Sequence, residues 1–356
     1  MDKIIKNVLD ELIEHGYDAY LVGGYVRDTL LGIKTFDVDI CTSALPKDIH
    51  ALFSVCTNNY GGANLIINNY NIDITTFREE GKYKERHPED VRYITDLKTD
   101  LMRRDFTINA ICMNSSGEVI DLLNGVEDLN NRVIKMIGNH EERLKDDPLR
   151  ILRAIRLATV LDFAIDGELL QALKDNANLV EKLSGERIKA ELDKILSSPN
   201  FKKGLELLAQ LKIDVIIGLS YEDINFTSDL MGMYAQVKVL KIPFTNNEKS
   251  NIIRITEVVN KGVINYETLF NYGLYINTVA GMILNIDVKK INQMYKKMPI
   301  KDKSDIVLNG NEIMEILNIG PSKEIKNIYS ELITEILSGR LKNKKSDIKK
   351  YLLKRK

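Results

Sequence analysis

The chain of 356 residues is long enough for two or more domains, and its formal charge of −1 excludes nucleic-acid binding through bulk positive charge. Its three cysteines, Cys41, Cys56 and Cys112, have no C-x-x-C spacing, which predicts reduced thiols in a cytoplasmic protein. Four scattered histidines argue against a zinc site, and no signal peptide or apolar membrane span is visible.

The amino-terminal segment predicts a helix and then a strand that ends in a glycine turn. Apolar side chains recur at helical spacing over residues 1–15. Residues 20–22 form an apolar, β-prone run. Gly23 and Gly24 follow, and because neither has a Cβ, the backbone can turn tightly there and approach a ligand closely.

A short helix over residues 25–31, with Arg27 in its first turn, leads to a strand over residues 36–40. Strand side chains alternate between faces, so Asp37 and Asp39 share one face, one pleat apart. Two such carboxylates repel each other, and a divalent cation relieves the repulsion; oxygen ligands beside phosphates suit Mg²⁺. A Gly-Gly turn at a helix start suits a triphosphate. An isolated D-x-D pair would otherwise be typical of an exposed strand edge.

The following segment, residues 64–77, is β-rich and contains one ambiguous carboxylate. Asp73 alternates with Ile72 and Ile74, so it either faces the aspartate pair from a neighbouring strand or is a polar residue of a half-exposed strand. Residues 77–93 are polar, charged and aperiodic, which predicts a solvated loop.

Arginines mark two later segments. Arg103 and Arg104 precede a mixed apolar run, and guanidinium groups suit phosphate or sugar oxygens. Further on, Pro148 fits the first position of a helix in which Arg150, Arg153 and Arg156 recur every three residues. Such a stripe is ordinarily a solvated face. No acid at the next turn offsets these charges, however, and we therefore expect an anionic partner.

The carboxyl half predicts helices with little recognisable chemistry. Helical periodicity covers residues 201–211 and 252–269, within an all-helical body. Residues 340–356 are strongly basic, which favours contact with an RNA phosphate backbone at least as much as simple solubility.

Taken in order, these motifs resemble those of a known family. LVGGYVRDTLLG…FDVDI looks like the first motif of the class II (bacterial-type) CCA-adding tRNA nucleotidyltransferases and bacterial poly(A) polymerases, which belong to the polymerase-β-like superfamily. RRDFTINA resembles the second motif, and DDPLR resembles E-D-x-x-R, with Asp146 where the family commonly has Glu. Residues 77–93 resemble the flexible loop of family members that add A, and residues 308–314 resemble a tail signature of Bacillus-type CCA-adding enzymes.

The resemblance implies roles for particular residues. Asp37 and Asp39 are expected to be the catalytic carboxylates and to hold two Mg²⁺ ions. Gly24, Arg27 and Arg104 are expected to bind the triphosphate and sugar of CTP or ATP.

A further set of residues is implied to recognise the base. Asp147 and Arg150 are expected to read cytosine and adenine, which both present an amino donor beside a ring-nitrogen acceptor. Guanine and uracil present a carbonyl and an N–H there instead. Arg153 and Arg156 are expected to support this pair and to contact phosphate.

The sequence therefore predicts an α+β fold in four parts: a polymerase-β-like nucleotidyltransferase head with a mixed sheet (1–135), then a helical neck (136–199), body (200–275) and tRNA-binding tail (276–356). The expected reaction is template-independent addition of CCA to the tRNA 3′ end from CTP and ATP, with release of pyrophosphate. The expected partner is the tRNA 3′ end and acceptor stem, with no membrane or DNA. The alternatives are an A-adding enzyme or poly(A) polymerase with the same site, and a catalytically inactive RNA-binding protein.

Overall fold

The computed structural model describes residues 1–54, 62–81, 83–84, 87–88 and 91–354. The chain divides into two compact units, Met1–Ile217 and Gly218–Lys356. The finer division into head, neck, body and tail stays a prediction. Cys56 and the last two residues of the predicted basic tail lie outside the described residues.

A mixed six-stranded sheet forms the centre of the first unit, in the order β10-β9-β1-β2-β4-β3. β2 and β4 run parallel, whereas the other neighbouring pairs are antiparallel. The strands of this unit are β1 (Ala19–Val22), β2 (Asp37–Thr42), β3 (Gly62–Ile67), β4 (Tyr70–Thr76), β5 (Arg78–Glu80), β6 (Tyr83–Lys84), β7 (His87–Pro88), β8 (Val91–Tyr93), β9 (Cys112–Met113), β10 (Val119–Ile120), β11 (Val133–Ile134) and β12 (Ala164–Ile165).

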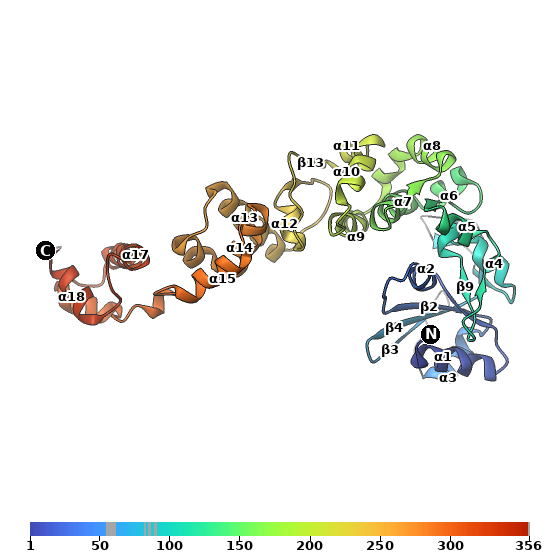
Figure 1. Ribbon diagram of the computed structural model, residues 1–356, viewed down its shortest axis with the longest axis horizontal. Helices are drawn as coiled ribbons and strands as arrows, with labels where there is room; N and C mark the ends of the chain where they lie inside the picture. Colours follow the sequence, from blue (N-terminus) through green and yellow to red (C-terminus); the bar gives the residue numbers. More distant parts are fainter. Residues whose placement is uncertain (55–61, 82, 85–86, 89–90, 355–356) are drawn as a thin grey trace. The chain divides into compact units, whose positions relative to one another are not determined.

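One face of this sheet is apolar because the strand residues alternate. Val38 and Ile40 of β2 and Ile72 and Ile74 of β4 are buried, while the aspartates between them point to the other face. α1 packs on β1 and α3 on β3, on the same side of the sheet in Figure 1. The polar face is thereby left for ligands, and the predicted mixed-sheet head is confirmed.

Helices complete the first unit after the sheet. They are α1 (Lys3–Glu14), α2 (Gly24–Leu30), α3 (Pro46–Phe53), α4 (Leu97–Met102), η1 (Thr107–Asn109), α5 (Gly125–Asn130), α6 (His140–Asp146), α7 (Leu149–Val160), α8 (Gly167–Asp175), η2 (Ala177–Lys182), α9 (Gly185–Leu196), α10 (Phe201–Gln210) and α11 (Ile213–Ile217). α7 packs against α9 and α10, so the basic helix predicted after Pro148 is largely surrounded by protein.

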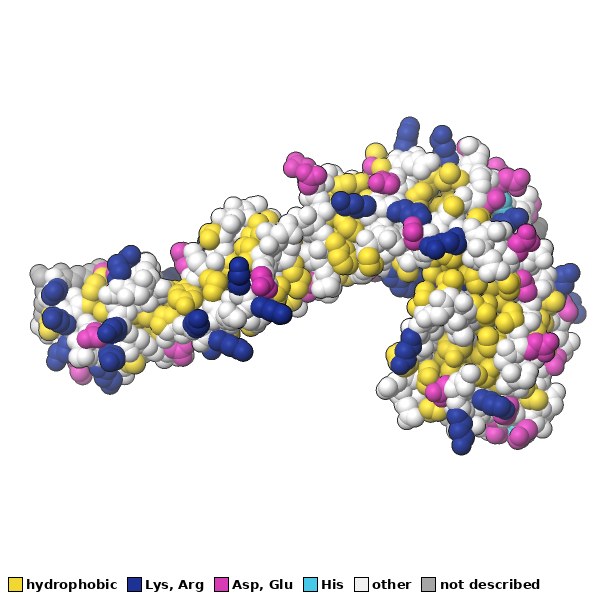
Figure 2. All heavy atoms as spheres, in the orientation of Figure 1, with side chains coloured by type: hydrophobic (Ala, Val, Ile, Leu, Met, Phe, Trp, Pro, Cys, Tyr) yellow, Lys and Arg dark blue, Asp and Glu magenta, His cyan; other side chains and the backbone are white. Residues whose placement is uncertain are grey.

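The second unit is almost entirely helical, as predicted. Its elements are β13 (Ser220–Tyr221), α12 (Leu230–Tyr234), β14 (Val237–Lys238), α13 (Asn246–Lys261), α14 (Tyr266–Ile283), α15 (Val288–Lys297), η3 (Lys303–Asp305), α16 (Gly310–Leu317), α17 (Lys323–Leu337) and α18 (Lys345–Lys354). Figure 2 shows Lys and Arg side chains over the visible face of this unit near its carboxyl end.

Two sequence predictions about secondary structure are wrong. The segment expected to be a loop at 77–93 contains paired strands, since β5 lies antiparallel to β8 and β6 to β7. Its residues show no two-residue alternation of apolar and polar types, so the sequence carried no strand signal. The single helix expected at 252–269 is instead two helices, since Gly262 adopts φ +65° and ends α13.

Candidate active site

The glycine turn places the start of α2 against a carboxylate of the neighbouring strand. Gly23 has φ +73°, and a Cβ built on it would lie 2.6 Å from Oδ2 of Asp39. Glycine is therefore needed for two reasons, the backbone conformation and the space that the carboxylate occupies.

We expect Gly23→Ala to lose most nucleotide incorporation, because the new methyl group must displace Asp39. Gly32→Ala is the matched control, since Gly32 also has a positive φ, +72°, but has open space around its Cβ position. Both variants should lose about 1–3 kcal/mol of stability from backbone strain. Thermal melts and incorporation assays compare the two, and equal loss of activity in both would exclude a specific effect on Asp39.

Three aspartates lie on the polar face of the sheet. Asp37 and Asp39 are one pleat apart on β2, and Asp73 of β4 lies in register with Asp39. Asn71 contacts Oδ1 of Asp37 through Nδ2 at 3.4 Å, and Nδ2 of Asn64 donates to Oδ1 of Asp73 at 2.8 Å. The register thus puts Asp73 on the same face as Asp37 and Asp39, and a contact of Asp73 with metal stays a prediction.

The electrostatics of Asp39 indicate a site that favours a cation. Burial raises the pKa of Asp39, Asp73 and Asp37 raise it further, and Arg104 and the Gly24 backbone N–H oppose the rise. Among the described residues, no group of three or more His, Cys, Asp or Glu side chains is arranged to hold a metal ion. Two carboxylates, completed by substrate phosphates and water, do fit Mg²⁺, which retains water and rarely uses an all-protein cage.

A hollow of about 380 Å³ opens beside this face in the first unit. Of the predicted site residues, it brings together Gly24, Asp39, Arg104, Asp147, Arg150 and Arg153. Its remaining lining residues are Gly23, Arg78, Arg103, Asp105, Asn109 and Leu149. The lining contains five arginines and three aspartates. This excess of positive charge suits an anionic ligand, and the aspartates suit a ligand that also carries hydrogen-bond donors.

Three predicted residues lie outside this lining. Asp37 adjoins it on β2. Arg27 forms an ion pair with Asp28 at 2.7 Å and donates from Nη1 to Oδ1 of Asn109 at 2.7 Å, and through Asn109 it is connected to the hollow. Arg156 forms an ion pair with Glu191 at 2.6 Å. A contact of Arg27 or Arg156 with nucleotide stays a prediction.

The arginines of α7 have acidic partners outside their own helix, which the pattern of that helix did not predict. Nε of Arg153 donates to Oδ2 of Asp105 at 2.7 Å, and Arg156 is paired with Glu191. These acids come from the segment after α4 and from α9, so no inspection of α7 alone could reveal them. Burial would raise the pKa of Asp105, but Arg153 and the hydrogen bond from Asn109 hold it below its usual range.

The base-reading pair predicted from the sequence stands at a helix junction. Asp147 is the C-cap of α6, and its Oδ1 accepts the backbone N–H of Leu149 at 3.2 Å. Arg150 in the first turn of α7 is 6% exposed, and its Nη1 donates to the carbonyl of Arg143 at 2.6 Å. The junction therefore presents a carboxylate and a guanidinium together at the wall of the hollow.

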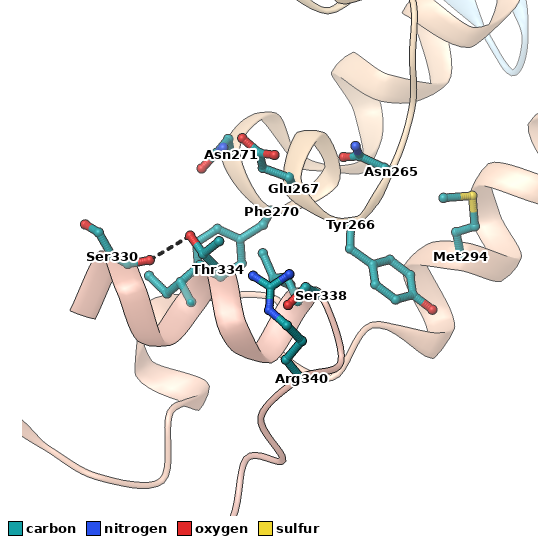
Figure 3. Close-up of a pocket in the computed structure, with 12 residues that line it drawn as sticks. Asn265, Tyr266, Glu267, Phe270, Asn271, Met294, Ser330, Thr334, Ser338 and Arg340 are labelled. Atoms are coloured by element: carbon teal, nitrogen blue, oxygen red, sulfur yellow. Dashed lines mark hydrogen bonds between the residues drawn. The ribbon is translucent and has the colours of Figure 1, made fainter. Parts of the chain in front are cut away.

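A second, larger hollow of about 710 Å³ lies in the second unit among α14, α15 and α17. Figure 3 shows Tyr266, Phe270 and Arg340 among its lining residues. Arg340 is bound to both carboxylate oxygens of Glu335, at 2.7 and 2.8 Å. Its lining has Glu267 as the single acid and no aspartate pair, so it lacks the groups that nucleotidyl transfer requires.

Comparison with known proteins assigns the chain to a family. Residues 19–135 match the poly A polymerase head domain, residues 162–215 the probable RNA and SrmB-binding site of polymerase A, and residues 240–352 a putative tRNA nucleotidyltransferase domain 2. A CCA-adding enzyme of Ligilactobacillus salivarius is 33% identical over 95% of this chain and 93% of its own length. The chain belongs to the bacterial CCA-adding enzyme and poly(A) polymerase family.

Other members of the family agree with this assignment. The CCA-adding enzyme of Streptococcus uberis is 32% identical over 98% of this chain and 95% of its own. The crystal structure of the Bacillus stearothermophilus CCA-adding enzyme in complex with CTP has 26% identity and a TM-score of 0.83, covering 100% of this chain and 98% of that one. The Thermotoga maritima enzyme, at 21% identity and a TM-score of 0.69, shares the fold.

The family members resemble this chain along its whole length, the second unit included.

Within the described part of the chain, no helix is long and apolar enough to cross a membrane.

Proposed function

We propose that this chain adds CCA to the 3′ end of tRNA, using CTP and ATP and releasing pyrophosphate. The observation that carries the proposal is a single hollow lined both by Asp39 of the D-x-D strand and by the Asp147–Arg150 pair. Relatives named CCA-adding enzymes, 32–33% identical over nearly the whole chain, support it. The relative of known structure that is described with CTP supports the same substrate class.

Asp37 and Asp39 hold the metal in this proposal. Their shared face, and the burial and neighbouring negative charge that raise the pKa of Asp39, fit a divalent cation. Asp37 and Asp39 would hold two Mg²⁺ ions, whose charge would favour ionisation of the tRNA 3′ hydroxyl and departure of pyrophosphate. The aspartates contribute the ligand oxygens, and Gly23 leaves the space in which Asp39 keeps its position.

The arginines of the hollow bind the triphosphate. Arg104 lies near Asp39, and the pKa of Asp39 responds to its charge. The Gly24 backbone at the start of α2 adds an N–H donor close to the same carboxylate. Arg27 contributes through Asn109, which it bonds at 2.7 Å. Guanidinium forks of this kind match phosphate oxygens two bonds at a time.

The protein itself takes the place of a template at the base. The Asp147 carboxylate accepts from the exocyclic amine of cytosine or adenine, and the Arg150 guanidinium donates to the adjacent ring nitrogen. Arg153 is fixed beside them by Asp105. Guanine and uracil place a carbonyl against the carboxylate, so they are repelled.

The basic carboxyl end supports tRNA as the partner. Residues 286–356 contain 17 Lys and Arg but only 9 Asp and Glu, although the whole chain is nearly neutral. Such a local excess of positive charge suits contact with the phosphate backbone of an RNA.

The state of the cysteines supports a cytoplasmic location. Cys41 and Cys112, the two cysteines within the described residues, are buried free thiols. Burial raises the pKa of the Cys41 thiol well above its usual value, which keeps it unreactive. Free thiols of this kind are typical of the reducing cytoplasm.

Incorporation into three tRNA transcripts, which end before CCA, after C and after CC, tests the proposal. Each transcript is offered labelled CTP, ATP or both, with Mg²⁺. Ordered addition of C, C and A that stops at A is expected. Addition of A only after CC would make this an A-adding enzyme, and long A tracts would make it a poly(A) polymerase. Absence of any incorporation would favour an RNA-binding protein without activity.

A further inference from the structure

A carboxylate that does not line the hollow contacts three of the arginines that do. Asp100, on α4, is fully buried. It accepts from Nε of Arg103 at 2.9 Å, forms an ion pair with Nη2 of Arg103 at 2.7 Å, and contacts Nη2 of Arg104 at 3.4 Å. It also accepts the backbone N–H of Arg78 at 3.1 Å. Asp100 therefore lies directly behind the arginine wall of the nucleotide hollow.

Helical spacing and strand pairing bring these groups together. Asp100 is on α4, and Arg103, the C-cap of this helix, and Arg104 follow it by three and four positions, a spacing that brings both side chains to Asp100. Arg78 begins β5, and its backbone reaches Asp100 because β5 packs against α4. One carboxylate thus anchors the two arginine side chains at the end of α4 and the backbone N–H of the first residue of β5.

The same two arginines are also held from the opposite direction. Nη2 of Arg143, on α6, donates to the backbone carbonyls of Arg103 and Arg104. Asp100 therefore fixes their guanidinium groups while Arg143 fixes their backbone. The backbone carbonyl of Arg143 also accepts a hydrogen bond from Nη1 of Arg150. The arginine wall is therefore connected to the base-reading junction.

A buried carboxylate is costly to place unless it is paired and hydrogen-bonded. Asp100 is paired with two arginines and bonded to a backbone N–H, so it is stable where it lies. Long arginine side chains lose rotamer freedom when they bind a ligand, and groups already held in place lose less of it at that moment. Ordering of these side chains before the nucleotide arrives is the effect that Asp100 can supply.

We propose that Asp100 is a positioning residue, which holds Arg103, Arg104 and the start of β5 in the geometry that binds the nucleotide triphosphate. The inference rests on the proposed function and adds to it a residue that does not touch the substrate. It acts through the arginines, so it should govern the affinity for nucleotide rather than the affinity for tRNA.

Asp100→Asn tests the proposal because it preserves shape and an acceptor oxygen but removes the charge. We expect the KM for CTP and ATP to rise roughly tenfold, as for the loss of charge-assisted hydrogen bonds. The kcat should change less, and the KM for tRNA should be unchanged. Calorimetric titration of CTP into the full-length protein with Mg²⁺ should show the same loss of affinity without relying on turnover.

Controls separate positioning from a general loss of stability. Leu12→Ala removes buried apolar surface of α1 away from the hollow, and it should lower the melting temperature without changing the KM for CTP. A double-mutant cycle combines Asp100→Asn with Arg103→Met. The effects of the two substitutions on the KM for CTP should not be additive, because both remove the same contact.

The outcomes distinguish this inference from the proposed function. If the unmodified protein adds no nucleotide to any tRNA, the proposed function fails. If it is active but Asp100→Asn binds CTP as tightly, the positioning role is overturned and the function stands. Should Asp100→Asn not fold, Arg103→Met removes the arginine side of the same contact; unchanged CTP affinity in that variant would equally overturn the role.

Discussion

Asp39→Asn should abolish nucleotide incorporation while leaving tRNA binding intact. The substitution removes a charged ligand oxygen from the pair on β2 but keeps the size of the side chain. A metal ion supplies several kcal/mol of transition-state stabilisation in such reactions, so the rate should fall at least about a thousandfold. Single-turnover incorporation of CTP into tRNA measures the rate, and a filter-binding assay measures retention of tRNA.

Asp10→Asn serves as the control for this experiment. Asp10 forms an exposed ion pair with Lys6 on α1, outside the hollow, and exposed pairs contribute little to stability. This variant should incorporate nucleotide normally. An Asp39→Asn protein that retained substantial activity would show that the proposed metal site is wrong.

The same substitution should stabilise the protein at neutral pH when no divalent cation is present. Burial, with Asp73 and Asp37 nearby, raises the pKa of Asp39 above its unfolded value, so the folded state binds the proton more tightly. The stability that this group contributes is therefore complete below the unfolded pKa and is lost as the pH rises through the folded pKa. Asparagine avoids that loss.

Thermal melts with and without Mg²⁺ examine this effect directly. Without the cation, Asp39→Asn should melt above the unmodified protein at pH 7, and its advantage should shrink as the pH falls below 4, the range of an ordinary aspartate. Mg²⁺ should raise the melting temperature of the unmodified protein more than that of the variant. An equal rise in both proteins would argue against Asp39 as a ligand.

Asp147→Ala should weaken discrimination between bases. Loss of the carboxylate removes the acceptor for the exocyclic amine and also the group that repels the carbonyl of uracil or guanine. A hydrogen bond to a charged group is worth about 1.5–3 kcal/mol, so the preference for CTP over UTP should fall by roughly ten- to a hundredfold. Competition between labelled CTP and unlabelled UTP or GTP measures this preference.

Asp146→Ala is the matched control, one residue earlier. Asp146 is the last residue of α6 and does not line the hollow, so this variant should keep the preference for CTP. If the Asp147→Ala variant discriminated against UTP and GTP to the same degree as the unmodified protein, the base-reading role of Asp147 would be excluded. The wall that selects the base would then have to be sought elsewhere in the hollow.

Local patterns predicted much of the head correctly because they depend on short-range geometry. The two-residue period of a strand put Asp37 and Asp39 on one face, and the burial of Val38 and Ile40 on the other face agrees. The glycine turn could also be predicted locally, because the positive φ of Gly23 is a backbone conformation that glycine adopts readily and other residues rarely do. The resemblance to known motifs then supplied the family, which the comparisons bear out.

The acidic partners of the arginines could not be predicted from the sequence. Asp105 binds Arg153, which is 48 positions away, and Glu191 binds Arg156 from another helix. A helix pattern records only neighbours at three or four positions, so α7 looked like an uncompensated basic stripe. Asp100 had the right spacing to Arg103 and Arg104, but nothing local indicated that it would be fully buried.

The sequence by itself determined which residues could carry the chemistry: two carboxylates on one strand face, a glycine turn beside them, and an acid and an arginine at a helix start. Tertiary structure alone decided which of them meet. Register between β2 and β4 set Asp73 beside Asp39, and packing of α6 and α7 on the head brought Asp147 and Arg150 to the hollow that Asp39 lines. Contacts between distant segments depend on how whole elements bury their apolar faces, and local periodicity carries no record of that choice.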